Sequence, residues 1–261
     1  MQFRRLPPFG GDPRAVAEIL NLVLDGKTNN TGLITLNTGN VTTTTLYDER
    51  ISEDTKIILL PFSDAAEQDT APYGQFQNDT DQTAPSTGTS ALVEWSSTVS
   101  SNGIYISNTT RVNVRNPGTY EVKYSLQLSN STNDGQYADI WVRKNGSNVA
   151  DSASRFYLVA RKSAGEPSHV IAFSNIFVDL AAGDYIEIAG SVTDVGVTLE
   201  HFAADGTVPR PAIPAALVSL NYIAPYAYSN IYVSSQSKGE AVISHFSNDT
   251  ANKTYAYILV G

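Results

Sequence analysis

The sequence predicts an all-β protein organised around an antiparallel sandwich. Apolar and polar residues alternate along 119–128, and shorter versions of the same pattern recur in 138–142 and 184–188. A period of two is typical of a strand that buries one face and exposes the other. Turn-forming residues bound these segments, with Pro117-Gly118 before the first and Asn145-Gly146 after the second. Several such strands separated by short turns indicate a β-sandwich.

The composition is that of an ordered protein, because 41% of the 261 residues are hydrophobic and only 16% are charged. The net charge of -9 disfavours nucleic acid as a partner, since phosphate binding needs clustered lysine and arginine. The absence of cysteine excludes disulfides, thiol nucleophiles and cysteine-ligated zinc. Apolar runs such as 57–60 are too short to span a bilayer, and neither a signal peptide nor membrane insertion is expected.

The first part of the chain is expected to contain one helix, between Asp12 and Asp25. Asp12 can cap this helix and Pro13 suits its first position. The apolar residues recur at three- and four-residue spacing along one side, at Val16, Ile19, Leu20, Val23 and Leu24. So short a helix is only marginally stable by itself. We therefore expect it either to pack on its own domain or to pack with other copies around a symmetry axis.

Short strands are expected after the helix, at 33–36, 41–47 and 56–62, with turn residues between them. Residues 1–62 are therefore interpreted as a helix followed by half of a β module. The composition then changes. Residues 63–89 are rich in Ala, Asp, Gln, Thr, Pro and Gly with little periodicity, which predicts a linker or extended arm.

The central block, residues 90–223, is expected to form a jelly roll of about eight to ten strands joined by short turns. The expected strands are 92–95, 104–107, 111–114, 119–128, 138–143, 155–159, 169–180, 185–192, 197–202 and 216–222.

The last part, residues 224–261, is expected to hold a three-stranded meander at 230–235, 240–246 and 254–260. Three strands bury little surface alone, and the strands of 33–62 lack partners in the same way. We therefore expect the two flanks to pair with each other, so that the jelly roll is inserted between them.

Four segments of the central block resemble the C1q/TNF-like jelly-roll family: 116–120, 140–146, 180–186 and 216–222. The resemblance covers about half of the chain, although the chain has neither a collagen stalk nor cysteine. Because that family commonly forms tight trimers, the resemblance implies a homotrimer.

The flanks resemble a small virion protein of tailed bacteriophages. The matching residues are 5–17, 25–32, 232–235, 238–239 and 254–257. This resemblance implies a structural component of the virion, assembled in the host cytoplasm. Such a protein would be a head decoration protein, a tail appendage or a fibre, bound to capsid or tail proteins through its flanks.

The residues offer no catalytic, metal or cofactor site. His169, His201 and His245 each fall in an expected strand without metal-ligand spacing, and no G-x-S-x-G motif is present. Asp184 and Glu187 are expected on opposite faces of one strand, which makes a poor pair for glycan hydrolysis. We therefore expect no enzymatic activity, and a hydrolase acting on envelope glycans is the least favoured alternative.

Surface residues carry the remaining functional predictions. Ile171, Phe173 and Phe177 share the face of 169–180 that lies opposite its other apolar residues. A strand apolar on both faces is covered on both, by the core on one side and by a neighbouring subunit or another element on the other. Trp141 alternates away from its apolar neighbours, and we include it in the predicted trimer interface.

The N-terminal segment is predicted to dock the protein onto the particle. It is basic, apolar and stiffened by prolines, and such an end is expected to be buried against a particle protein or a sister subunit. The predicted anchor residues are Arg4, Arg5, Leu6, Phe9, Val16 and Leu20. An adhesin that binds a host receptor or a surface glycan is the main alternative, and the sequence does not separate the two functions.

Overall fold

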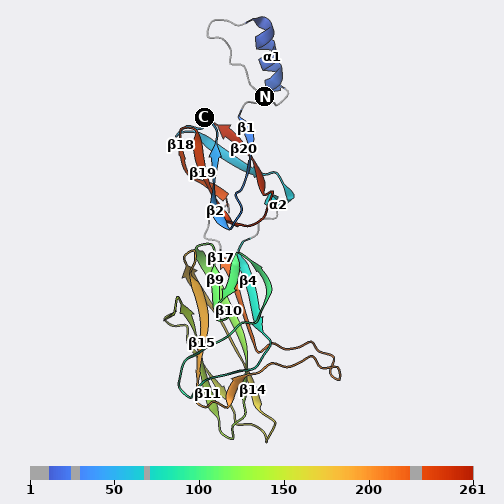
Figure 1. Cartoon of the computed structure of the whole chain (residues 1–261), viewed down its shortest axis with the longest axis vertical. Helices are drawn as coiled ribbons and strands as arrows, with labels where there is room; N and C mark the ends of the chain where they lie inside the picture. Colours follow the sequence, from blue (N-terminus) through green and yellow to red (C-terminus); the bar gives the residue numbers. More distant parts are fainter. Residues whose placement is uncertain (1–11, 25–29, 68–70, 224–230, 261) are drawn as a thin grey trace. The chain divides into compact units, whose positions relative to one another are not determined.

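The structure is a computed structural model and describes residues 12–24, 30–67, 71–223 and 231–260 (Figure 1). Strands dominate these residues, so the predicted all-β class is confirmed. The chain divides into two compact units. Met1–Asp69 and Ser229–Gly261 make up the flanking unit, and Thr70–Tyr228 form the central unit. The central unit is therefore an insertion in the flanking one.

The flanking unit combines strands from both ends of the chain. In one of its sheets β20 pairs with β1 and β3, and in the other β19 pairs with β18 and β2, all antiparallel. Each sheet therefore mixes early and late strands. The three-stranded meander predicted for 224–261 is wrong, because β18 pairs with β19 but β20 lies in the other sheet, between β1 and β3. The elements are α1 (Pro13–Leu24), β1 (Thr31–Thr35), β2 (Val41–Tyr47), β3 (Lys56–Pro61), α2 (Asp64–Glu67), β18 (Ile231–Ser237), β19 (Glu240–Asn248) and β20 (Thr254–Val260).

Polar contacts also tie the two flanks together. The hydroxyl of Tyr257 donates a 2.7 Å hydrogen bond to Asp48, which also forms an ion pair with Arg50. The hydrogen bond from Arg50 is the main reason that the pKa of Asp48 lies well below its usual range. His245 and Thr44 are buried and lie within hydrogen-bond distance, with Nε2 and Oγ1 2.9 Å apart.

The predicted cap of α1 is confirmed. The backbone N–H of Arg14 donates a 3.0 Å hydrogen bond to Oδ1 of Asp12, the residue before Pro13. This bond satisfies one of the amide groups that a helix start leaves without an internal partner. The expected end of the helix at Asp25 lies outside the described residues.

The central unit is an antiparallel jelly-roll sandwich of two sheets. In chain order, β9, β10, β11, β14, β15 and β17 alternate between the two sheets, as in a jelly roll. The first sheet contains β4 (Tyr73–Asn78), β5 (Gln82–Thr83), β7 (Ser97–Asn102), β10 (Gly118–Asn130), β14 (Ser168–Leu180), β16 (Val197–Leu199) and β17 (Ala216–Ile223). The second contains β6 (Ala91–Leu92), β8 (Ile104–Ser107), β9 (Arg111–Val114), β11 (Gln136–Lys144), β12 (Ser147–Asn148), β13 (Ser154–Leu158) and β15 (Tyr185–Val192).

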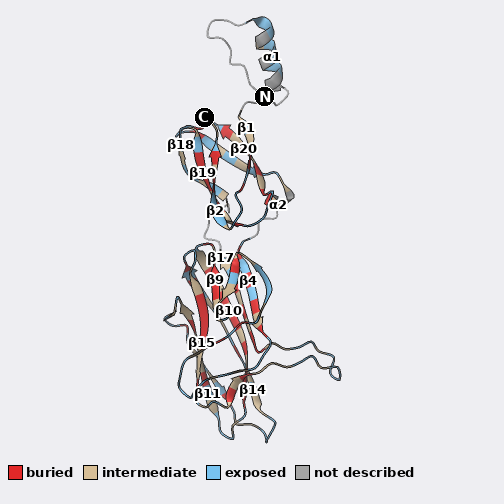
Figure 2. Cartoon of the chain, in the orientation of Figure 1, coloured by how far each residue is buried: buried red, intermediate tan, exposed pale blue. Residues whose placement is uncertain are grey.

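The core of the central unit lies between these sheets (Figure 2). The alternation read from the sequence is confirmed in β10, where Tyr120, Val122 and Tyr124 are buried. β10 pairs with β14 along its whole length, and its other edge pairs with β17 and β16. β14 is therefore the outermost strand on its side of the first sheet.

The linker predicted at 63–89 is wrong for most of its length. β4 lies in this segment, between β17 and β7, and Phe76 on β4 is fully buried in the core. The alternation was not recognisable because Gly74 and Asn78 occupy the other inward positions of the strand. The jelly roll consequently begins near Thr70 and not at residue 90.

Candidate functional site

The three predicted interface residues of β14 lie together on the outer side of the first sheet. Ile171, Phe173 and Phe177 are 60%, 58% and 63% exposed. They form an apolar row along the outermost strand, whereas the neighbouring outward residues of β10 are Gln127, Ser125 and Glu121. Within the described residues these three side chains stay mostly exposed, with Asn175 between Phe173 and Phe177 on the same face. Exposed apolar side chains gathered in this way are a candidate interaction site.

The polar groups beside this apolar row are already paired within the chain. The carboxylate of Glu121 lies 2.8 Å from Nζ of Lys123 and accepts a 2.9 Å hydrogen bond from Nδ2 of Asn175. The bond from Lys123 is the main cause that lowers the pKa of Glu121. Beside Phe177, the charged groups of Glu121 and Lys123 are therefore paired with each other.

Trp141 lies on the other outer face of the sandwich. It is on β11 in the second sheet, and its neighbours Ile140 and Val142 are buried in the core. Trp141 therefore points away from the core on the side opposite to Phe173. The structure brings the three β14 residues together and separates Trp141 from them, so the predicted four-residue interface is not one continuous surface.

An open groove of about 510 Å³ lies beside Trp141, and we refer to it as the Trp141 groove. The indole Nε1–H donates a 2.8 Å hydrogen bond to Oδ1 of Asn148, which fixes the orientation of the ring. Asp139 and Arg155 form a two-point ion pair of 2.7 and 2.8 Å, and this pair lowers the pKa of Asp139. The groove is lined by Asp139, Trp141, Asn148, Val149, Asp151, Ala153, Ser154, Arg155 and Ser191.

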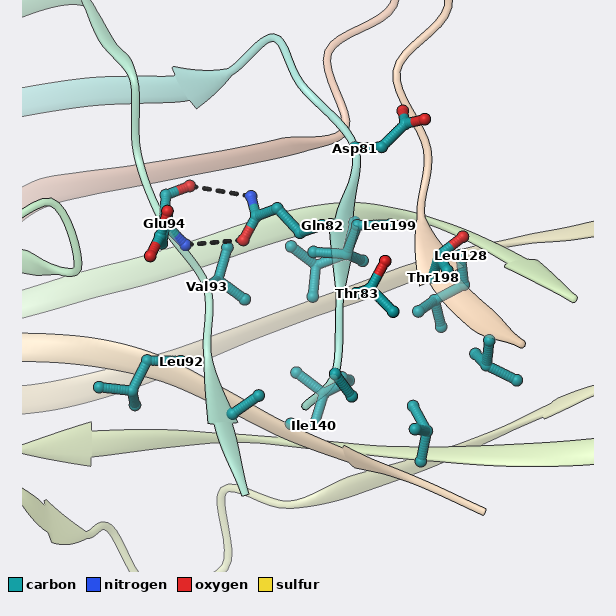
Figure 3. Close-up of a pocket in the computed structure, with 16 residues that line it drawn as sticks. Asp81, Gln82, Thr83, Leu92, Val93, Glu94, Leu128, Ile140, Thr198 and Leu199 are labelled. Atoms are coloured by element: carbon teal, nitrogen blue, oxygen red, sulfur yellow. Dashed lines mark hydrogen bonds between the residues drawn. The ribbon is translucent and has the colours of Figure 1, made fainter. Parts of the chain in front are cut away.

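A second hollow, of about 310 Å³, opens between the two sheets under residues 81–94 (Figure 3). Its inner wall is apolar and includes Leu128, Ile140 and Leu199. The covering segment is fixed because the side-chain amide of Gln82 makes two hydrogen bonds of 2.9 and 3.0 Å to the backbone of Glu94. The inner wall of this hollow belongs to the sandwich core, whereas Asp81, Gln82, Thr83, Glu94 and Thr198 make up its polar part.

The predicted anchor residues are described only in part. Arg4, Arg5, Leu6 and Phe9 lie outside the described residues. The others are on α1, where Val16 is partly buried and Leu20 is 56% exposed.

Among the other candidate groups, His169 pairs with Glu200 at 2.9 Å. Within the described ranges, no three or more histidine, aspartate or glutamate residues are gathered as ligands for a metal ion. None of the helices in the described part of the chain is long and apolar enough to cross a membrane.

Asp184, considered above as a possible carboxylate for glycan cleavage, instead joins two turns. It accepts hydrogen bonds from Nδ2 of Asn145 at 2.7 Å and from the backbone N–H of Ala181 at 2.8 Å. It also lies 3.0 Å from Nζ of Lys144. These contacts lower the pKa of Asp184, and the hydrogen bond from Asn145 has the largest effect. The turn segments that carry the family resemblance therefore meet at this carboxylate.

Sequence reasoning missed a charged cluster on the outer side of the second sheet. The side chain of Glu187 is almost fully buried, 3.3 Å from Nε of Arg111 and 3.5 Å from Nη1 of Arg143. The guanidinium of Arg111 also lies over the ring of Tyr185, 4.3 Å from its centroid. The two arginines come from β9 and β11, and no local sequence pattern around Glu187 indicates that they cover it.

The comparisons with known proteins identify no family for the chain. No family model matches the sequence, and no curated protein matches it. Among solved structures, the chain is similar to murine APRIL, in a crystal structure at pH 8.5, with a TM-score of 0.38 and 13% sequence identity. That match covers 58% of this chain and 99% of APRIL. The jelly-roll assignment of the central unit rests on the strand pairings given above.

Proposed function

We propose that the protein is a structural virion protein of a tailed bacteriophage. In this proposal it forms a homotrimeric knob, fibre or decoration protein, attached to the capsid or tail by its flanking unit. The phage assignment is supported by the resemblance of the flanking residues described in the sequence analysis. The trimer is supported by one structural observation, the uncovered apolar row of Ile171, Phe173 and Phe177.

The contacts around the apolar row suit association between identical subunits. Covering two phenylalanines and an isoleucine removes apolar surface from water, and Glu121 beside them is paired with Lys123 within the chain. Asp179, on the same face, accepts a hydrogen bond from the hydroxyl of Thr119. Stable homodimers and homotrimers use interfaces of this kind, which resemble a divided core. The pairing of Glu121 with Lys123 and Asn175 reduces the desolvation cost of such an interface, because these groups keep their partners when the face is covered.

Attachment to the particle is assigned to the flanking unit. Leu20 leaves an apolar side chain of α1 in contact with water, and an isolated helix of this length is marginally stable. Packing of α1 against a capsid or tail protein, or against α1 of the sister subunits, would bury Leu20.

The proposal is tested on particles produced by the genome that encodes the chain. Mass spectrometry of purified particles should detect the protein, and its copy number should be a multiple of three. Particles that lack the protein would overturn the virion assignment. A copy number that is not a multiple of three would overturn the trimer.

Host recognition is a second candidate function. The observation that favours it is the Trp141 groove, which lies on the opposite outer face from the proposed trimer contact. A protein trimerised through the first sheet would keep this groove open to solvent.

A further inference from the structure

We propose that the Trp141 groove is a binding site for an uncharged oligosaccharide. The inference deepens the second candidate function and does not depend on the phage assignment. It rests on the aromatic rings, the free hydrogen-bonding groups and the charge of one face of the second sheet.

The first observation is a row of aromatic and polar side chains on that face. Tyr137, Asp139 and Trp141 are alternate residues of β11, so all three point outward. Tyr137 and Trp141 are four residues apart, which separates them by about 13 Å along the strand. A short oligosaccharide with one sugar ring stacked on Trp141 spans this distance, whereas a monosaccharide does not.

Both aromatic rings are held in place by contacts within the chain. The indole N–H of Trp141 is bonded to Asn148, so the ring offers its apolar surface and not its polar edge. Trp141 pairs across the sheet with Ala189, a small residue that leaves room for the indole. Tyr137 packs against Tyr157, with ring centroids 5.2 Å apart, and the guanidinium of Arg155 lies over the Tyr137 ring, 5.3 Å from its centroid. The fixed ring of Trp141 can stack against the C–H face of a sugar ring with little loss of entropy.

The second observation is the number of hydrogen-bonding groups without a protein partner around Trp141. Within the described residues, no bond engages Nδ2 of Asn148, the carboxylate of Asp151 or the hydroxyls of Ser154 and Ser191. The groove therefore presents both donors and acceptors, which is what the hydroxyl groups of a sugar require.

The wall that carries these groups is preorganised. The hydroxyl of Ser152 donates to the backbone carbonyl of Val149 at 2.8 Å and accepts from the N–H of Val142 at 3.1 Å. The backbone N–H of Val149 donates to the carbonyl of Val142 at 2.9 Å. These bonds hold 148–152 against β11, so little ordering of the loop is needed on binding.

The charge of the groove identifies the class of sugar. Asp139 and Arg155 neutralise each other through their two-point ion pair. Asp151 is exposed and has no ion-pair partner among the described residues, so the groove carries a net negative charge. Sialylated, sulfated or uronate-containing glycans would be repelled by Asp151, which leaves uncharged glycans as the ligand class.

The experiment uses the full-length protein, labelled with a fluorophore, on an array of neutral, sialylated and sulfated oligosaccharides. We expect neutral oligosaccharides to bind and the anionic ones not to bind. Isothermal titration with the best neutral trisaccharide should show at least about a tenfold loss of affinity for Trp141→Ala, which corresponds to about 1.4 kcal/mol. Trp141→Phe, which keeps an aromatic ring, should lose less.

Asp151→Asn provides a second variant that removes no packing. The positive φ of 57° at Asp151 is a conformation that asparagine also adopts. This variant should retain neutral ligands and gain binding of anionic ones. Failure of every neutral glycan to bind, or unchanged affinity of Trp141→Ala, would overturn the proposal. Light scattering gives the mass of each sample and so reports trimerisation independently of glycan binding. A trimer that binds no neutral glycan would overturn this inference alone, whereas a monomeric mass would count against the trimer alone.

Discussion

Replacing Phe173 and Phe177 with aspartate is expected to convert a trimer into monomers. Each phenylalanine side chain is about 60% exposed in the single chain. An aromatic side chain buries about 150–250 Å² when fully covered, so each leaves roughly 90–160 Å² for a neighbour to cover. At about 25 cal/mol per Å², this contributes about 2–4 kcal/mol for each side chain. Losing one contact therefore weakens association roughly 30- to 1000-fold, and the added carboxylate weakens it further.

The assay is light scattering coupled to size-exclusion chromatography of the full chain over a range of micromolar concentrations. The unmodified protein should have three times the chain mass of 28.1 kDa, and the double variant should have the mass of one chain. Val208→Asp is a matched control, because Val208 is 60% exposed but lies in the loop between β16 and β17. A monomeric mass for the unmodified protein, or a trimeric mass for the double variant, would refute the reasoning.

Three further predictions concern stability. Phe76→Ala should lower the free energy of unfolding of the central unit by about 3–5 kcal/mol in urea denaturation, and a loss below about 1 kcal/mol would show that β4 is not part of the core. Asp48→Asn should cost the flanking unit about 1.5–3 kcal/mol, because Tyr257 loses a charged acceptor. The folded state lowers the pKa of Asp48, so the ionised carboxylate contributes its full share to the free energy of unfolding above about pH 4. This contribution is lost as the pH falls further. Urea unfolding of the unmodified protein and of Asp48→Asn at pH 7 and at pH 3 should therefore show a smaller difference at pH 3. A fragment of residues 70–228 should show cooperative unfolding by circular dichroism whereas 90–223, which lacks β4, should not; equal cooperativity would contradict the revised boundary.

Strands were predictable from the sequence where the buried side chains form an unbroken alternation. Tyr120, Val122 and Tyr124 make such a pattern in β10, and β14 repeats it. β4 escaped prediction because its inward positions include Gly74 and Asn78, which carry no apolar side chain. β7 escaped because Ser97–Asn102 holds a single apolar residue, Val99, and is mostly exposed. Both strands are specified by their partners in the sheet and not by their own composition.

The orientation of the candidate surface residues was predictable from the sequence, but their place in the fold was not. Alternation correctly indicated that Trp141 and Phe173 point away from the core, because that property depends only on the residues beside them. It did not indicate which outer face each occupies, because that depends on which sheet β11 and β14 join. The ion pair of Asp139 with Arg155 was unpredictable for the same reason, because the two residues meet only when β13 pairs with β11.

The separation of these two surfaces bears on how one chain could combine assembly with recognition. A contact that buries Phe173 removes the outer side of the first sheet from solvent, but it leaves the second sheet free. Binding in the Trp141 groove would then be repeated once in each subunit of a trimer. Three weak sites on one rigid knob gain affinity for a glycan-covered surface through effective concentration, without any new contact. A modest affinity of each groove for a single oligosaccharide is therefore compatible with firm attachment of a trimer. The same variant that abolishes trimerisation should reduce binding to a glycan-coated surface while leaving the affinity for the soluble trisaccharide unchanged.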